Sequence, residues 1–162
     1  MVNMLDEINL SRKASRRIRL FASLALASLL VTSTAWAEML SVAVDRANFR
    51  EAPSTKAAIL YTADKYYSVE VLERKDDWIK TRDFEGDIAW VAAFLVEKRD
   101  SVVISVPTAL VRKSPDKNSP VVFKADRGEG MRVILRQGQW INVASSDGMV
   151  GWVHREVVWV GQ

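Results

Sequence analysis

The chain contains an internal duplication in which matching positions are offset by 62 residues. Residues 148–158, GMVGWVHREVV, repeat the pattern of residues 86–96, GDIAWVAAFLV, and the same offset aligns Trp140 with Trp78 without a gap. A repeat of roughly 60 residues is the size of one small domain. The sequence therefore predicts two tandem domains of one kind rather than a single larger domain.

Short apolar stretches separated by polar turns fill the chain after the first 37 residues. Residues 68–73 are the clearest example, because Val69 and Val71 face the same way, as alternate residues of a strand do. No stretch of this part keeps a helical pattern for long. Several short strands in about 60 residues are typical of a small barrel. The predicted fold class is all-β, with two tandem small β-barrels at residues 38–98 and 99–162.

The two copies carry net charges of opposite sign. Residues 38–98 hold nine basic and twelve acidic side chains, a net charge of −3. Residues 99–162 hold nine basic and six acidic side chains, a net charge of +3. This difference favours docking of the domains on each other, and a basic second domain would also suit an anionic envelope polymer. Only Lys98, Arg99 and Asp100 separate the repeated patterns, so we expect a fixed mutual orientation.

The first 37 residues have the three parts of a secretory signal peptide. A basic segment ends at Arg19, an apolar stretch follows at residues 20–31, and small residues lead to Ala37. We expect export to the periplasm or the exterior with cleavage after Ala37, and a retained N-terminal anchor is the alternative. The apolar stretch is shorter than the roughly 20 residues that a membrane span needs, so no stable span is expected after cleavage.

The excess of basic residues does not indicate a nucleic-acid partner. The chain has 23 basic and 20 acidic side chains, of which five basic and two acidic ones lie in residues 1–37. The remaining 18 basic and 18 acidic side chains balance, so the rest of the chain has no net charge. A phosphate backbone is bound through a positive surface, which this remainder lacks. The predicted partners therefore exclude nucleic acid.

No set of residues indicates catalysis or a metal site. The chain has no cysteine, and His154 is its only histidine. It therefore lacks a thiol nucleophile and has too few histidines for a His/Cys metal site, and one histidine offers little from which to assemble a catalytic base oriented by a third group. The duplication aligns His154 with Ala92, which places it outside the shared framework. We expect no catalytic residue, no metal and no cofactor.

Both copies resemble the bacterial SH3-like (SH3b) module. Its pattern is an Asn-x-Arg-x-x-Pro segment, a central apolar strand, a Trp that opens the next strand, and a closing Gly-Trp-Val-x-x-x-x-Leu. The matching residues are Asn48, Arg50, Pro53, Trp78, Ala89, Trp90, Val91 and Leu95 in the first copy, and Leu110, Arg112, Pro115, Trp140, Gly151, Trp152, Val153 and Val157 in the second. Two of these residues depart from the pattern: Ala89 replaces the Gly in the first copy, and Leu110 replaces the Asn in the second. Since Asn favours turns, we expect a differently built turn at Leu110.

The resemblance implies association with the cell envelope, because such modules often accompany cell-wall enzymes. Combined with the predicted export, it predicts a non-enzymatic binding module that recognises peptidoglycan or another envelope component. The alternative is a structural or regulatory adaptor in the periplasm that binds another protein through a sheet edge or an aromatic groove.

Comparison of the copies selects the candidate ligand-binding residues. The four framework tryptophans occur in both copies, which favours a role in each core, and the alternative is that one of each pair lines a surface groove. Three further aromatic residues of the first copy stand opposite non-aromatic residues, so an aromatic site is expected there. The candidates are Tyr66, Tyr67, Phe84 and Trp90 in the first copy, and Lys113, Lys117, Lys124 and Arg127 in the second.

Overall fold

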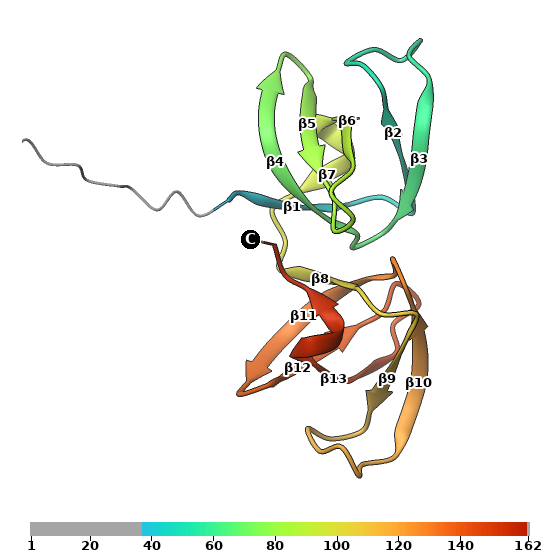
Figure 1. The fold of residues 1–162 in the computed structure, drawn as a ribbon, viewed down its shortest axis with the longest axis vertical. Coiled ribbons are helices and arrows are strands. Elements are labelled where there is room, and N and C mark those ends of the chain that lie inside the picture. Colours follow the sequence, from blue (N-terminus) through green and yellow to red (C-terminus); the bar gives the residue numbers. More distant parts are fainter. Residues whose placement is uncertain (1–36, 162) are drawn as a thin grey trace, which may run out of the picture. The chain divides into compact units, whose positions relative to one another are not determined.

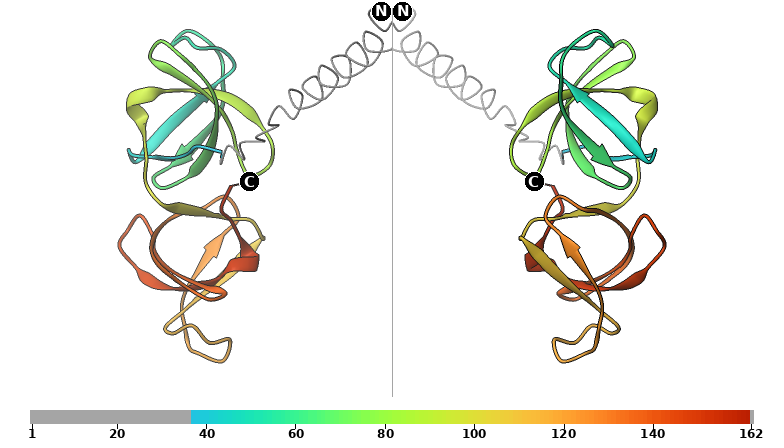
Figure 2. Two further views of the ribbon diagram at one scale, coloured as in Figure 1. Left: turned by 90° about the vertical axis from the view of Figure 1, so that its left-hand side faces the viewer. Right: turned by 90° about the vertical axis from the view of Figure 1, so that its right-hand side faces the viewer.

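A computed structural model describes residues 37–161, so the predicted signal peptide lies outside the described residues except for Ala37. The described chain forms two seven-stranded antiparallel sheets, drawn in Figure 1 in blue to yellow and in yellow to red. Each sheet curls around its own core, as both views of Figure 2 show. The all-β prediction of two tandem small barrels is confirmed.

The first barrel contains the elements β1 to β7. They are β1 (Met39–Val42), β2 (Arg46–Arg50), β3 (Ile59–Asp64), β4 (Ser68–Lys75), β5 (Trp78–Arg82), β6 (Ile88–Ala92), the 3-10 helix η1 (Ala93–Leu95) and β7 (Val96–Glu97). The strands lie in the order β3-β2-β6-β5-β4-β1-β7, which leaves β3 and β7 at the two ends of the sheet.

The second barrel repeats this plan. Its elements are β8 (Ser101–Ile104), β9 (Thr108–Arg112), β10 (Val121–Asp126), β11 (Gly130–Gln137), β12 (Trp140–Ala144), β13 (Val150–His154), the 3-10 helix η2 (Arg155–Val157) and β14 (Val158–Trp159). Its strands lie in the order β10-β9-β13-β12-β11-β8-β14, in which each strand takes the place of its counterpart in the first barrel. Among residues 37–161, no helix is long and apolar enough to cross a membrane.

The turn between β4 and β5 consists of two residues, as does its counterpart between β11 and β12. Two-residue hairpins require a left-handed residue, and Asp76 takes that role with φ 51°. Gly138 stands at the same place in the second barrel with φ 58°. The backbone therefore repeats although the side chain differs.

The Arg of the Asn-x-Arg-x-x-Pro segment holds the loop that follows it. Arg50 Nη1 donates to the Ala57 carbonyl at 2.7 Å, and Arg112 Nη1 donates to the Ser119 carbonyl at 2.7 Å. Asn48 lies within β2 opposite Thr62, so it builds no turn. The expectation of a different turn at Leu110 was wrong, because strands β2 and β9 cover matching positions.

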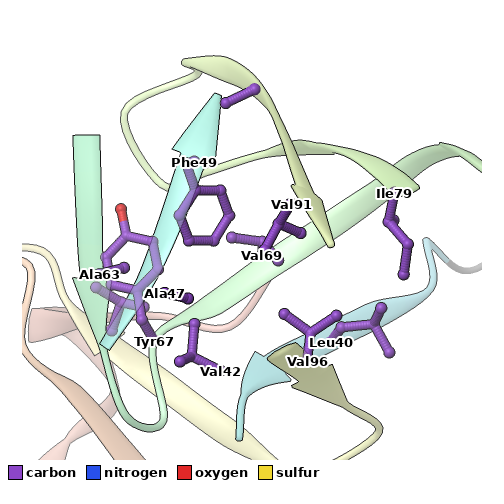
Figure 3. Close-up of a cluster of buried hydrophobic side chains, with 12 residues drawn as sticks. Leu40, Val42, Ala47, Phe49, Ala63, Tyr67, Val69, Ile79, Val91 and Val96 are labelled. Atoms are coloured by element: carbon purple, nitrogen blue, oxygen red, sulfur yellow. The ribbon is translucent and has the colours of Figure 1, made fainter. Parts of the chain in front are cut away.

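Aromatic rings and smaller apolar side chains together fill the first core. Figure 3 shows Phe49, Val69 and Val91 pointing toward one another from three strands. Val69 is fully buried, while Val71 is only partly buried, because a shift of register after Val71 bends the strand. Ser68, Val69 and Glu70 are all buried, so burial does not alternate along β4, although Val69 and Val71 both pack toward the first core as predicted.

The framework tryptophans are not in the cores, so that interpretation was wrong. Ile79 and Thr81 of β5 point inward. Trp78, one residue before Ile79, therefore lies on the outer face of the strand, where it is half-buried. The other three framework tryptophans are likewise half-buried and belong to neither core cluster. Strand alternation decides this outcome, because each Trp is one residue away from a buried position.

Strand β8 is buried on both faces because it lies between the two cores. Val102 and Ile104 belong to the second core, whereas Val103 belongs to the first. The last strand, β14, behaves in the same way, since Val158 packs in the second core and Trp159 against the first. Residues of the second barrel therefore complete the first core.

Polar contacts accompany this shared packing. The hydroxyls of Ser68 and Ser101 form a buried hydrogen bond of 2.6 Å. Gly130 of β11 lies so close to the first barrel that a Cβ on it would be 2.2 Å from the Tyr67 nitrogen. The two barrels are thus in direct backbone contact at this point.

Candidate functional site

A cleft of about 850 Å³ opens at one end of the first barrel. Its walls come from β3, from the turn between β5 and β6, and from the turn between β10 and β11 of the second barrel. Three predicted site residues, Tyr67, Phe84 and Arg127, line it. The cleft exists only because both barrels contribute a wall, so the tandem arrangement itself builds the site.

Aromatic rings form a continuous wall below the cleft. Phe49 stacks on Tyr61 with ring centroids 4.7 Å apart, and it meets Tyr67 edge-on at 6.3 Å. Tyr67 in turn contacts Phe84 edge-on at 6.1 Å. Tyr67 is 7% exposed, so its ring belongs to the first core and its hydroxyl is the part that reaches the cleft.

The Asp83 carboxylate organises the turn that forms one wall. Its Oδ1 accepts hydrogen bonds from the backbone nitrogens of Glu85 and Asp87, both at 2.9 Å. Its Oδ2 accepts from the Tyr67 hydroxyl at 3.1 Å. Asp83 is 5% exposed, and this set of donors satisfies a carboxylate that would otherwise be costly to bury.

Both tyrosines of the cleft keep their protons. Burial raises the pKa of Tyr67 well above its usual value, and the Asp83 carboxylate raises it further. Burial likewise raises the pKa of Tyr61, with the carboxylates of Asp83 and Asp87 acting in the same direction. The Tyr61 hydroxyl is buried near the Asp83 carboxylate but forms no hydrogen bond of normal geometry with another described residue.

Arg127 crosses from the second barrel to the first. Its guanidinium forms an ion pair with the Glu85 carboxylate at 3.0 Å and lies 5.0 Å from the centre of the Phe84 ring. It also donates to the Ser105 carbonyl of its own barrel. Arg127 is therefore engaged in holding the cleft together, and its charge is partly neutralised by Glu85.

The other predicted residues do not reach the cleft. Tyr66 has φ 70° and lies between two cations, 5.6 Å from Lys65 Nζ and 6.0 Å from the Arg99 guanidinium. Trp90 lies on the outer face of β6, where Lys80 Nζ is 5.9 Å from its ring. Lys113, Lys117 and Lys124 are exposed on the second barrel and are absent from the lining of the cleft.

Sequence comparison missed the acidic character of the cleft. Its lining includes the carboxylates of Asp64, Asp83, Glu85, Asp87 and Glu129 but only two basic side chains, Lys65 and Arg127. Burial raises the pKa of Glu129, and the nearby carboxylates of Asp126 and Asp147 contribute in the same direction. The signal was present in the sequence, because Asp83 and Asp87 align with the uncharged Ser145 and Met149.

The cleft can donate and accept hydrogen bonds and can attract a cation. Among residues 37–161, no three His, Asp or Glu side chains converge where they could hold a metal ion. The lining suits binding of a ligand through hydrogen bonds to carboxylates and tyrosine hydroxyls and through packing on the Phe84 ring.

Two solved structures resemble this chain only weakly. NlpC2 from Trichomonas vaginalis is 10% identical, with a TM-score of 0.34 over 76% of this chain and 48% of that one. An NlpC/P60 family protein from Bacillus cereus ATCC 10987 is 13% identical, with a TM-score of 0.36 over 75% of this chain and 55% of that one. A likeness of this degree carries no argument about function.

A protein relative gives a closer match in sequence. The chain is 26% identical over 131 residues to the putative N-acetylmuramoyl-L-alanine amidase YrvJ of Bacillus subtilis strain 168. The match covers 74% of this chain but 25% of the amidase, so the chain spans a quarter of that relative's length.

The family comparison coincides with the two barrels. The model of the bacterial SH3 domain matches residues 45–97 and residues 108–158, which together make up more than half of the chain. The first segment runs from the start of β2 to the end of β7, and the second from β9 into β14. The chain therefore belongs to the bacterial SH3 domain family.

Proposed function

We propose that this protein is an exported, non-enzymatic binding module of the cell envelope that recognises peptidoglycan at the cleft. The observation that carries the proposal is the composite cleft, in which an aromatic wall meets a surplus of carboxylates. The family membership and the similarity to a putative amidase of the cell wall support it. Export rests on the signal peptide that we predict for residues 1–37.

The chemistry of the lining suits the peptide part of peptidoglycan. Peptide amides and free amino groups are donors, and the Glu85, Asp87 and Glu129 carboxylates are acceptors at the cleft. Apolar side chains of a bound peptide can pack on Phe84. Binding of this kind needs no reactive group, in keeping with a module that recognises rather than cleaves.

Retention of the purified protein by murein sacculi tests the proposal. The wild-type protein is expected to sediment with sacculi at moderate salt. Phe84→Ser introduces the residue that the second barrel has at the same position, Ser146, and is expected to weaken retention about tenfold through lost ring contact. Leu72→Ser is the matched control, because Leu72 is 40% exposed and lies outside the cleft. No retention of the wild-type protein would refute the proposal.

Three lysines of the second barrel form a separate part of this hypothesis. Lys113, Lys117 and Lys124 are exposed and form no ion pair with another described residue. Such cations suit an anionic envelope polymer. Replacing all three with Glu is expected to weaken capture of an acidic polymer, and unchanged capture would remove these residues from the binding surface.

A periplasmic adaptor is the second candidate function, and the sheet edges favour it. Strands β3 and β10 lie at the ends of their sheets and carry exposed apolar residues at matching positions. Ile59 is 49% exposed and Val121 is 43% exposed, and neither lines the cleft. Such edges can pair with a strand of another protein, and a charge placed on them prevents it. Ile59→Lys with Val121→Lys should abolish capture of an envelope protein while retention by sacculi is unchanged.

A further inference from the structure

A second groove, of about 550 Å³, lies on the first barrel away from the cleft. It is formed by β2, the turn before β5, the end of β6 and the helix η1, and it shares no lining residue with the cleft. Two aromatic side chains, Trp78 and Phe94, face it. Phe94 is 79% exposed, which is unusual for a phenylalanine that serves only the fold.

The second barrel shows what a closed version of this groove looks like. In the first barrel Trp78 pairs across the sheet with Ala92, whose side chain is only a methyl group. In the second barrel Trp140 pairs with His154, and the imidazole packs edge-on against the indole at 5.1 Å. Both tryptophans are half-buried, but the same scaffold packs an imidazole ring against Trp140 and only a methyl group against Trp78.

Phe94, the second aromatic side chain of the groove, also differs between the two barrels. Phe94 of η1 aligns with Glu156 of η2, whose backbone nitrogen donates to the His154 imidazole. The second barrel thus replaces an exposed ring with a carboxylate and uses the adjacent histidine to cap the helix. Both changes that open the groove occur in the first barrel only.

Polar side chains with unused capacity complete the groove. Asn48 and Asp77 form no side-chain hydrogen bond with another described residue, and Arg50 uses one guanidinium nitrogen to hold the loop at Ala57. The Asp77 carbonyl accepts from Ala93 at 2.8 Å, which fixes the turn against η1. Donors and acceptors therefore surround the two rings in a defined arrangement.

We propose that this groove binds a saccharide. A sugar ring presents an apolar C–H face that packs on an aromatic ring, and its hydroxyls both donate and accept hydrogen bonds. The exposed Asp77 carboxylate can only accept hydrogen bonds, so it favours a ligand that donates. A proline-rich peptide, the other common occupant of an aromatic groove, offers carbonyl acceptors and few donors. The lining therefore favours hydroxyl groups over a proline-rich backbone.

The test is a titration of the purified protein with the β-1,4-linked tetramer of N-acetylglucosamine. Two-dimensional NMR follows the indole N–H signals, assigned through Trp78→Phe and Trp140→Phe. The Trp78 signal is expected to shift on titration, while that of Trp140, which His154 covers, stays in place. A proline-rich decapeptide is expected to leave both signals unchanged.

Variants taken from the second barrel link the binding to the groove. Phe94→Glu is expected to bind the tetramer about tenfold more weakly, because one ring contact is lost. Ala92→His, which copies the cover of Trp140, is expected to remove binding. Leu72→Glu is the control, since it places the same charge on a residue that is 40% exposed outside the groove, and it should bind like wild type.

Three outcomes would overturn the proposal: no saturable binding of the tetramer, a response to the peptide in its place, or equal affinity of Phe94→Glu and wild type. The result is independent of the cleft, because Phe84→Ser changes none of the residues that line the groove. Retention by sacculi that depends on Phe84 would survive failure of the saccharide titration, and a positive titration would survive failure of that retention.

Discussion

The contact of Gly130 with the first barrel predicts that Gly130→Ala separates the two barrels. An added Cβ would lie 2.2 Å from the Tyr67 nitrogen and 2.3 Å from the Tyr66 carbonyl carbon, whereas ordinary contact begins at 3.4 Å. These neighbours are backbone atoms and cannot swing aside. The barrels must therefore move apart by about 1 Å at this point, the scale of shift that overpacking produces.

The energetic effect follows from what such a shift would loosen. The buried hydrogen bond between Ser68 and Ser101 is worth about 1 kcal/mol, and the exposed ion pair of Arg127 with Glu85 at most about 1 kcal/mol. Partial exposure of Val103 adds about 1 kcal/mol. We expect Gly130→Ala to lower the free energy of unfolding by about 2–3 kcal/mol, in line with measured overpacking.

The duplication shows that the change itself is compatible with the strand. The first barrel has Ser68 at the matching position, and Ser68 pairs with Ser41 as Gly130 pairs with Val103. A side chain at this place therefore does not harm a β-strand of this barrel. The loss of stability would report docking between barrels and not misfolding of the second one.

Urea unfolding gives the free energy, and NMR relaxation gives the tumbling of each barrel. Wild type should tumble as one body, and Gly130→Ala as two partly independent ones. Gln137→Ala is the control, because Gln137 is exposed on the same strand β11 and should change stability by less than about 0.5 kcal/mol. An unchanged free energy together with unchanged signals of Ser101 and Tyr66 would refute the reasoning.

Three further predictions follow from single contacts. Gly151→Ala should lower the free energy of unfolding by about 1–3 kcal/mol, because the new Cβ would lie 2.8 Å from the Arg112 carbonyl oxygen, and an unchanged urea midpoint would contradict this. Ser41→Ala should raise it by about 1 kcal/mol, since the Ser41 hydroxyl is buried without a partner among residues 37–161, and a loss of stability would contradict this. Glu129→Gln should stabilise the protein at neutral pH. The folded pKa of Glu129 is raised by burial, so its ionised form costs stability as the pH rises from the unfolded value of about 4.3 through the folded pKa. Unfolding measured between pH 3 and pH 8 should show the advantage of the variant vanish at the acid end, and a constant difference would contradict the reasoning.

The duplication and the period-two pattern predicted the fold because both are properties of the backbone. A constant offset without a gap transfers each strand from one copy to the next, down to the two-residue turn in which Asp76 and Gly138 share a left-handed φ. Strand alternation also places the framework tryptophans on the outer faces of their strands. The presence of a Trp in the sequence, however, does not show which face of its strand points toward the core. Recurrence of Trp78 and Trp140 was therefore mistaken for membership of a core.

The cleft was predictable only in part, because its second wall comes from the other barrel. Tyr67 and Phe84 were found as differences between the copies, and both line the cleft. The hydroxyl of Tyr61 was missed because its counterpart, Phe123, is also aromatic and the comparison registers no contrast there. Contacts such as that of Arg127 with Glu85 depend on the packing of the barrels, which no local pattern encodes.

The sharing of β8 and β14 between the cores has a consequence for the order in which this protein folds. Val103 and Trp159 both cover the first core, and Trp159 lies near the end of the chain. During synthesis the first barrel leaves the ribosome before either residue, so its core stays partly open to water until Trp159 has also emerged. Contacts between such distant segments form slowly, and open cores aggregate. A chain that stalls before Trp159 should therefore be a substrate for chaperones rather than a folded half.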